Sequence, residues 1–164
     1  MERFQITGKN KEFGKVLFQT YFKNVEKMRE EYHAAKFIAV CRERTQWVNP
    51  DIVCDEWEKN LAPSGELLRD WKAHNINWDE YVQRFLAEME KPKAQEVMLT
   101  IAKEAQTHDV FLVCYEGPGK HCHRYLLLDL IMKLAVQNNI EIEVCSAVKP
   151  NRKDMDLFSF LSIS

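Results

Sequence analysis

The sequence lacks the features of a secreted, membrane-spanning or strongly charged protein. None of its apolar runs approaches the roughly 18 residues that a membrane span needs, and the polar start, Met1 to Gln5, lacks the apolar core of a signal peptide. The net charge is only −2, which does not suggest nonspecific coating of nucleic acid, although a local basic patch is compatible with it. We therefore expect a cytoplasmic protein without a membrane partner.

Glycine and proline are scarce, with 5 of each in 164 residues, and no Gly/Ser-rich linker, internal repeat or low-complexity segment divides the chain. This length suits one domain with a full hydrophobic core. The apolar fraction of 46% and the charged fraction of 29% are ordinary for a globular protein. We predict a single domain over residues 1–164, with an N-terminal extension over 1–14, a helical insertion over 50–105 and a C-terminal tail over 147–164.

Several familiar catalytic motifs are also missing. The segment G-P-G-K at 117–120 is not a Walker A loop, which needs G-x-x-x-x-G-K-[ST], and it lacks the G-x-G-x-x-G of a dinucleotide-binding fold. Cysteine phosphatases place an arginine six positions after the nucleophile, whereas Lys120 follows Cys114 and Leu128 follows Cys122 at that spacing. These absences argue against all three classes of protein.

The chain does contain 5 cysteines, an odd number that argues against a disulfide scaffold in a protein without a signal peptide. Reduced thiols can instead fill the core, bind metal or act in catalysis. Three of them end predicted strands: Cys41 ends F-I-A-V-C, Cys114 ends V-F-L-V-C and Cys145 ends I-E-I-E-V-C.

The hydrophobic pattern predicts an α/β fold in three layers, with a mostly parallel sheet and a helical insertion between the second and third main strands. The strand–helix–strand unit over 110–145 favours parallel pairing with a right-handed connection. The predicted strands cover 16–21, 36–41, 110–114 and 140–145; the predicted helices cover 65–73, the stretch between Asn77 and Pro92, 94–106, and a run that begins within 121–124 and ends near Asn138.

The segment from Val110 to Arg124 is the main candidate for a site, because ligands of open α/β sheets bind just outside the carboxyl ends of the strands. Cys122 stands at a predicted helix N-terminus, where the helix dipole and free N–H groups favour a thiolate. For nucleophilic catalysis, the candidates are the Cys122 thiolate or Cys114 activated by His123, with Glu116 as acid or base and Arg124 as anion contact.

Two other interpretations of the same segment stay open. Cys114, Cys122 and a histidine such as His123, with Cys41 as fourth ligand, could bind zinc or iron. Alternatively, the loop, the helix N-terminus and Arg124 could bind an anion without chemistry. The protein would then be a nonenzymatic module that holds a nucleotide or nucleic acid through Arg42, Arg44 and Arg124. The candidate substrate contacts, for a small anion, a nucleotide or nucleic acid, are Arg42, Arg44, Gly117, Gly119 and Lys120.

Four segments resemble the domain of unknown function 488 (DUF488) family: V-C-R-E-R-T-Q-W at 40–47, L-A-P-S-G-E-L-L at 61–68, W-D-E-Y-V-Q-R-F at 78–85 and the C-H-R segment at 122–124. The resemblance covers about residues 35–146. It implies a small α/β domain with a mostly parallel sheet, but no particular cofactor, reaction or substrate. The family site that it implies consists of Cys41, Cys114, Glu116, Cys122, His123 and Arg124.

Overall fold

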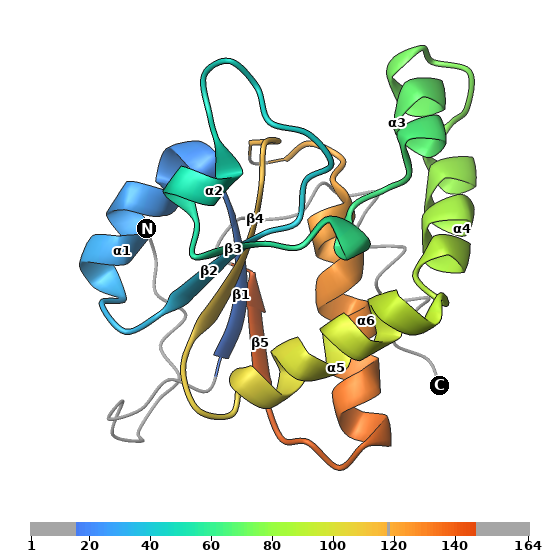
Figure 1. The fold of residues 1–164 in the computed structure, drawn as a ribbon. Helices are drawn as coiled ribbons and strands as arrows, with labels where there is room; N and C mark the ends of the chain where they lie inside the picture. Colours follow the sequence, from blue (N-terminus) through green and yellow to red (C-terminus); the bar gives the residue numbers. More distant parts are fainter. Residues whose placement is uncertain (1–15, 118, 147–164) are drawn as a thin grey trace.

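The computed structural model describes residues 16–117 and 119–146, which form a parallel β-sheet between two layers of helices (Figure 1). The predicted N-terminal extension and the C-terminal tail lie outside these residues. The sheet has the order β3-β2-β4-β1-β5, and every strand pair in it is parallel. The strands are β1 (Val16–Tyr21), β2 (Lys36–Ala39), β3 (Glu56–Trp57), β4 (Val110–Cys114) and β5 (Glu143–Ser146). The predicted three-layer α/β fold is therefore confirmed.

The central strand β4 is buried along its whole length, as the unbroken run V-F-L-V-C predicts for a parallel strand that is covered on both faces. β5 alternates polar and apolar residues, and it does lie at an edge of the sheet. The other edge strand, β3, was not predicted. It has only two residues and no apolar run, and it exists because Ile38 and Ala39 of β2 pair with Glu56 and Trp57.

A different set of helices covers each face of the sheet (Figure 1). α1 (Val25–Glu31) and the short α2 (Pro50–Val53) lie on one side, and α5 (Pro92–Glu104) and α6 (His123–Gln137) lie on the other. The remaining elements are α3 (Gly65–Lys72), α4 (Trp78–Glu88) and the 3-10 turns η1 (Phe22–Asn24) and η2 (Lys59–Leu61). α2 to α5 all lie between β2 and β4, which confirms the predicted insertion.

Side-chain caps begin the two outer helices of the insertion where the sequence predicts them. Ser64 Oγ accepts a hydrogen bond from Leu67 N at 3.1 Å, and Asn77 Oδ1 accepts one from Glu80 N at 2.9 Å. Pro92 has a second role besides closing the preceding helix, because it is the first residue of α5. In the described part of the chain, no helix has the length and apolar character needed to cross a membrane.

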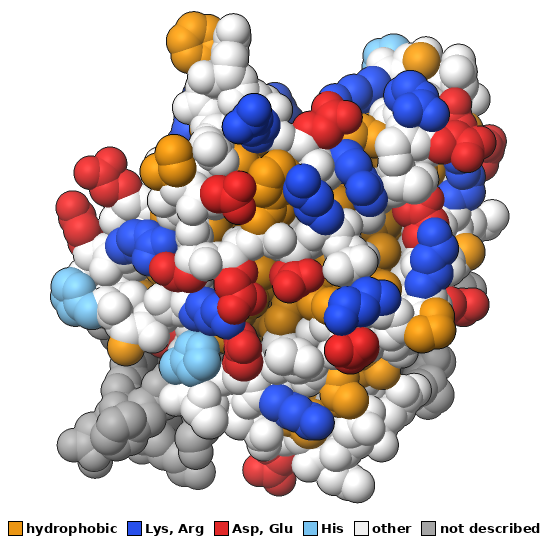
Figure 2. Space-filling view, viewed as in Figure 1, with side chains coloured by type: hydrophobic (Ala, Val, Ile, Leu, Met, Phe, Trp, Pro, Cys, Tyr) orange, Lys and Arg blue, Asp and Glu red, His pale blue; other side chains and the backbone are white. Residues whose placement is uncertain are grey.

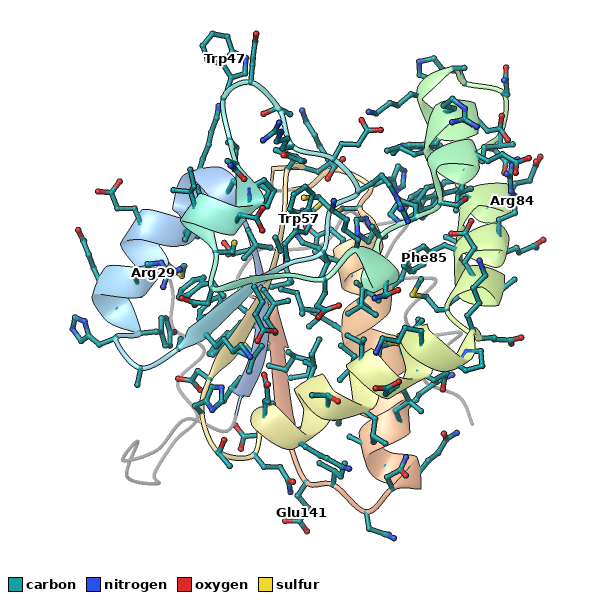
Figure 3. The ribbon with its side chains drawn as sticks, viewed as in Figure 1. Arg29, Trp47, Trp57, Arg84, Phe85 and Glu141 are labelled. Atoms are coloured by element: carbon teal, nitrogen blue, oxygen red, sulfur yellow. The ribbon has the colours of Figure 1, made fainter. Side chains whose placement is uncertain are left out.

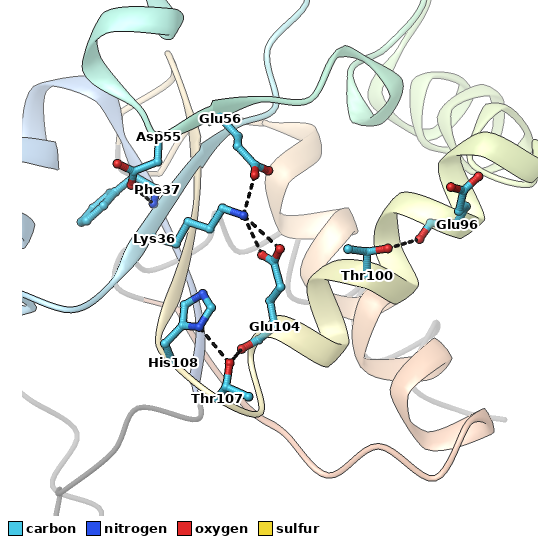
Figure 4. Close-up of polar contacts among 9 residues, drawn as sticks. All are labelled: Lys36, Phe37, Asp55, Glu56, Glu96, Thr100, Glu104, Thr107 and His108. Atoms are coloured by element: carbon cyan, nitrogen blue, oxygen red, sulfur yellow. Dashed lines mark hydrogen bonds and ion pairs between the residues drawn. The ribbon is translucent and has the colours of Figure 1, made fainter.

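One ion-pair network ties the insertion to the amino end of the sheet (Figure 4). Lys36 Nζ of β2 lies 2.6 Å from Glu56 Oε1 of β3 and 2.9 Å from Glu104 Oε1 at the end of α5. Burial alone would lower the pKa of Lys36, but its hydrogen bonds and charge pairs with both glutamates raise it. The network thus joins two strands and one helix at the end of the sheet opposite the candidate site.

Candidate active site

The carboxyl ends of β2 and β4 lie side by side, because Ala39 pairs with Val113. Cys114 is the last residue of β4, and Cys41 follows the end of β2. The loop after β4 leads to Cys122, the N-cap residue of α6. Topology therefore brings the predicted segments 40–44 and 110–124 together at one edge of the sheet, as the parallel pairing requires.

Glu116 lies between two thiols. Its Oε2 atom is 3.3 Å from Cys114 Sγ and 3.2 Å from Cys122 Sγ, and each cysteine is only 3% exposed. Burial, followed by the charge on Cys122, raises the pKa of Glu116 to about 7. The carboxyl group is therefore poised to hold a proton beside a thiolate at neutral pH.

His123 is oriented by the backbone of β2's carboxyl end. Its Nε2 atom lies 2.7 Å from the Val40 carbonyl oxygen, and its Nδ1 atom lies 3.8 Å from Cys122 Sγ. A carbonyl oxygen can only accept a hydrogen bond, so Nε2 carries the proton in this contact. In the neutral ring, the lone pair of Nδ1 then faces the thiol. Burial alone would lower the pKa of His123, but the charge on Cys122 raises it.

Arg124 is fully buried beside the cluster. Its Nε atom donates to Gln19 Oε1 on β1 at 2.5 Å, and Nη2 donates to Tyr125 Oη at 3.4 Å. Nη1 is buried and has no hydrogen-bond partner within the described residues. A buried donor of this kind is rare without a ligand or an ion to satisfy it. The guanidinium charge therefore remains available to a thiolate or to a bound anion.

The two thiols differ in acidity. Burial alone would raise the pKa of Cys122, but the hydrogen bond from Cys114 and the charges of Arg124 and His123 lower it well below its usual value. The hydrogen bond with Cys122 and burial raise the pKa of Cys114 well above its usual value. These shifts favour the thiolate form of Cys122 and the thiol form of Cys114. The position of Cys122 at the N-terminus of α6 favours the same assignment.

The other two strand-end cysteines stand outside this pair. Burial raises the pKa of Cys41 to about 11, and the negative charges on Glu116 and Cys122 act in the same direction. Cys145 pairs with Phe18, which also pairs with Phe111 on the opposite side. Cys145 thus lies level with the second residue of β4, and it is separated from that strand by β1. Although Cys145 also ends a predicted strand, the register of β5 places it away from the carboxyl edge where Cys41 and Cys114 lie.

A metal ion would meet a compact set of donors here. The ligand atoms of Cys114, Cys122 and His123 all lie within 4.8 Å of one another. Within the described part of the chain, the predicted fourth ligand, Cys41, does not belong to this group. Glu116 Oε2 contacts both sulfurs, but Glu116 does not belong to the group either. Two thiolates and one imidazole are ligands that zinc accepts, and a fourth ligand would have to come from outside this group.

The predicted substrate contacts lie at the mouth of the site and outside it. Arg42 is half-buried, and its Nε donates to the Pro63 carbonyl at 2.7 Å. Arg44, Gly119 and Lys120 are exposed, whereas Gly117 is half-buried. Gly119 adopts φ = 76°, a left-handed conformation that favours glycine in this loop.

An aromatic wall from α4 and the end of α3 closes one side of the site. The His121 ring stacks on Trp78 at 4.3 Å between centroids, and Phe85 packs against His123 at 5.4 Å. Figure 3 shows Phe85 on α4 pointing toward α6. Burial, followed by the charge on Cys122, raises the pKa of Tyr81 well above its usual value, which places its hydroxyl near the cluster. The expected packing of the insertion onto the sheet therefore also forms part of the site.

Sequence reasoning missed Gln19, the Val40 carbonyl and Phe85 as partners of the site. Gln19 offered one visible indication, because a polar residue interrupts the apolar strand V-L-F-Q-T-Y and is fully buried there. The other two contacts depend on how β2 and α4 pack against α6, which no local pattern indicates.

A wholly parallel sheet with a carboxylate between two buried thiols at its carboxyl edge defines a small α/β protein with a buried Cys/His cluster. The chain belongs to the DUF488 family: the model described as the active DUF488-N3 subclade, DUF488-N3a, matches residues 20–135. No curated protein and no solved structure matches the chain. The matched span contains all six residues of the site that the resemblance implied: Cys41, Cys114, Glu116, Cys122, His123 and Arg124.

Proposed function

We propose that this protein is a cysteine-dependent enzyme that acts on a small anionic or nucleotide-related substrate, with Cys122 as its nucleophile. The observation that carries the proposal is the orientation of His123. The Val40 carbonyl holds Nε2 at 2.7 Å, so that Nδ1 faces Cys122 Sγ. A nucleophile, a base and a group that orients the base form the arrangement that thiol catalysis requires.

The neighbouring groups supply the remaining roles. Cys122 Sγ would attack an electrophilic atom of the substrate, and the bond to the leaving group would break as the new bond to sulfur forms. Glu116, protonated near neutral pH, would give its proton to the departing group, which also takes the electron pair of the broken bond. Water, deprotonated by Glu116, would then release the product from Cys122.

Arg124 and the N-terminus of α6 would bind negatively charged groups of the substrate. The unpartnered Nη1 of Arg124 is a donor for an anionic substrate group. Among the described residues, no side chain caps the first turn of α6, so its backbone N–H groups are available to a developing oxyanion. Because Cys122 is only 3% exposed, the site is suited to a small or slender group.

Thiolate absorbance in the ultraviolet tests this proposal without requiring reagent access. We expect the wild type to retain a thiolate at pH 6–7, where an unperturbed thiol with a pKa of about 8.5 is almost fully protonated. Cys122→Ser should lose this signal, whereas Cys54→Ser, which removes another buried thiol, should keep it. Alkylation of Cys122 with iodoacetamide, followed by mass spectrometry, gives a second readout. Equal absorbance in the wild type and in Cys122→Ser at pH 6–7 contradicts the proposal.

A metal-binding domain is the second candidate function, favoured by the three donor atoms that lie within 4.8 Å of one another. Its test is elemental analysis of protein purified without chelators and without a metal-affinity step. Zinc or iron near one equivalent, lost in Cys114→Ser, supports metal binding. Less than a tenth of an equivalent, with no uptake on addition of zinc, removes this alternative.

A further inference from the structure

The connection between β2 and β3 forms two shallow hollows on the surface beside the thiol site. One hollow, of about 580 Å³, is lined by Arg42, Arg44, Trp57 and Lys59 together with Glu43 and Asp51. The other, of about 620 Å³, runs along Trp47 and Ile52. Arg44 lines both hollows. Figure 2 shows lysine and arginine side chains gathered on this face, with acidic side chains among them.

Two large apolar side chains of this connection are exposed to solvent. Trp47 is 84% exposed and Ile52 is 80% exposed. Figure 3 shows Trp47 at the tip of the loop, pointing away from the body of the protein. The other three tryptophans are buried or packed against the core. An indole kept in solvent beside an arginine is the combination that stacks a nucleobase and holds its phosphate.

The hollow that contains Trp57 is fixed directly to the site. Trp57 Nε1 donates to the Cys41 carbonyl at 2.7 Å, and Lys59 Nζ lies 4.0 Å from the centre of the indole ring. Arg42, held by the Pro63 carbonyl, stands on the same wall. Cationic groups therefore flank an indole that is fixed to the backbone of Cys41.

The loop that carries Trp47 is also anchored to the site, through a single tyrosine. Tyr115, which follows Cys114, donates from its hydroxyl to the Glu43 carbonyl at 2.8 Å and accepts from Thr45 N at 3.1 Å. The residues that line both hollows are thus held in a fixed position relative to the loop between β4 and α6.

We propose that this surface, from Trp47 through Arg44 to Trp57 and Lys59, binds a short stretch of single-stranded nucleic acid. The exposed indole of Trp47 stacks a base without regard to sequence, and the arginines and the lysine contact the phosphates. The hollow that contains Trp57 is lined by three cationic and two acidic side chains. We therefore expect the surface to neutralise only two or three phosphates. The binding of the strand does not depend on the proposed function. The further step, in which the bound strand presents a reacting unit to Cys122, does rest on it.

Fluorescence anisotropy of a short labelled oligothymidylate tests the proposal. With two or three phosphate contacts, the logarithm of the association constant should fall with the logarithm of salt concentration at a slope of about −2. We expect Trp47→Ala to weaken binding roughly tenfold, and Trp47→Phe to restore part of it. Arg44→Glu should weaken binding and reduce the slope by about 0.7. Lys103→Glu, an exposed charge change on α5, should leave binding unchanged.

The controls separate this inference from the proposed enzyme. Cys122→Ser leaves the surface intact and should bind the oligonucleotide as the wild type does, whatever the thiolate measurements show. Because Trp47 is exposed, Trp47→Ala should retain the thermal midpoint of the wild type. The inference is overturned if the oligonucleotide does not bind at low salt, or if Trp47→Ala and Arg44→Glu bind it as well as the wild type. Equal competition by an acidic peptide of the same charge also overturns it, in favour of a protein partner.

Discussion

Glu116 accepts contacts from two sulfurs through one oxygen atom, and its acidity follows from this position. Its pKa rises from an ordinary value of 4.5 to about 7. Between these values the folded protein binds more protons than the unfolded chain, so the stability falls as the pH rises through this window. We expect the wild type to lose about 2 kcal/mol of unfolding free energy between pH 4.5 and 7, allowing for partial contact with solvent.

Glu116→Gln should flatten this dependence and be more stable than the wild type at pH 8, because glutamine carries no charge to bury. Chemical denaturation at pH 5 and pH 8 measures both effects. The exposed Glu30→Gln serves as matched control. In a Cys122→Ser background the effect of Glu116→Gln should be smaller, because the charge on Cys122 is one cause of the raised pKa of Glu116. An unchanged pH dependence in Glu116→Gln would show that the carboxyl group titrates normally.

The sequence alone could group residues of the site only where they lie in one continuous segment. Cys114, Glu116, Cys122, His123 and Arg124 fall within eleven consecutive positions, and the passage from strand to helix brings them together. Their acidity was not predictable to the same degree. The dipole argument favoured a thiolate at Cys122, but the hydrogen bond from Cys114 and the proton shared with Glu116 depend on side-chain geometry.

At the scale of secondary-structure elements, strands with continuous apolar runs were predictable and β3 was not. A two-residue strand has too little sequence to show a pattern, and its pairing with β2 creates it. The charge network beside it depends on the same pairing. Lys36 reaches Glu56 on β3 and Glu104 on α5, which are far apart in the sequence. No spacing rule for helices or hairpins anticipates such a contact.

Lys36→Met removes the ion pairs that join β2 to β3 and α5. We expect it to lower the unfolding free energy by about 1 kcal/mol at pH 7, because two carboxylates lose their partner while retaining some solvent. The pKa of Lys36 is raised, so its contribution is present below pH 10 and disappears as the pH rises through the folded value. Urea denaturation at pH 7 measures the loss. Lys93→Met breaks only the exposed pair with Glu96 and should cost less than about 0.5 kcal/mol; equal costs would contradict a special role for the junction.

At the scale of the whole molecule, the order of elements was predictable because hydrophobic runs and caps mark them along the chain. The way the insertion folds back on the sheet was not, because it depends on contacts between distant faces. Phe85, on the insertion, is fully buried and lies 5.4 Å from the His123 ring. One hydrophobic core contains both the insertion and the sheet. The site therefore has one wall from each part of the chain.

A shared core predicts that the insertion and the sheet unfold together. In a Trp57→Phe background, fluorescence reports mainly on Trp71 and Trp78 of the insertion, since Trp47 is already exposed and Trp57 belongs to the sheet. Far-ultraviolet circular dichroism reports on all elements. We expect the two probes to give one transition. Phe85→Ala should lower the unfolding free energy by about 3–4 kcal/mol through the cavity that it leaves, and it should shift both curves equally. A fluorescence transition that moves alone would mean that the insertion is a separate folding unit, and that the aromatic wall of the site can detach from the thiols it covers.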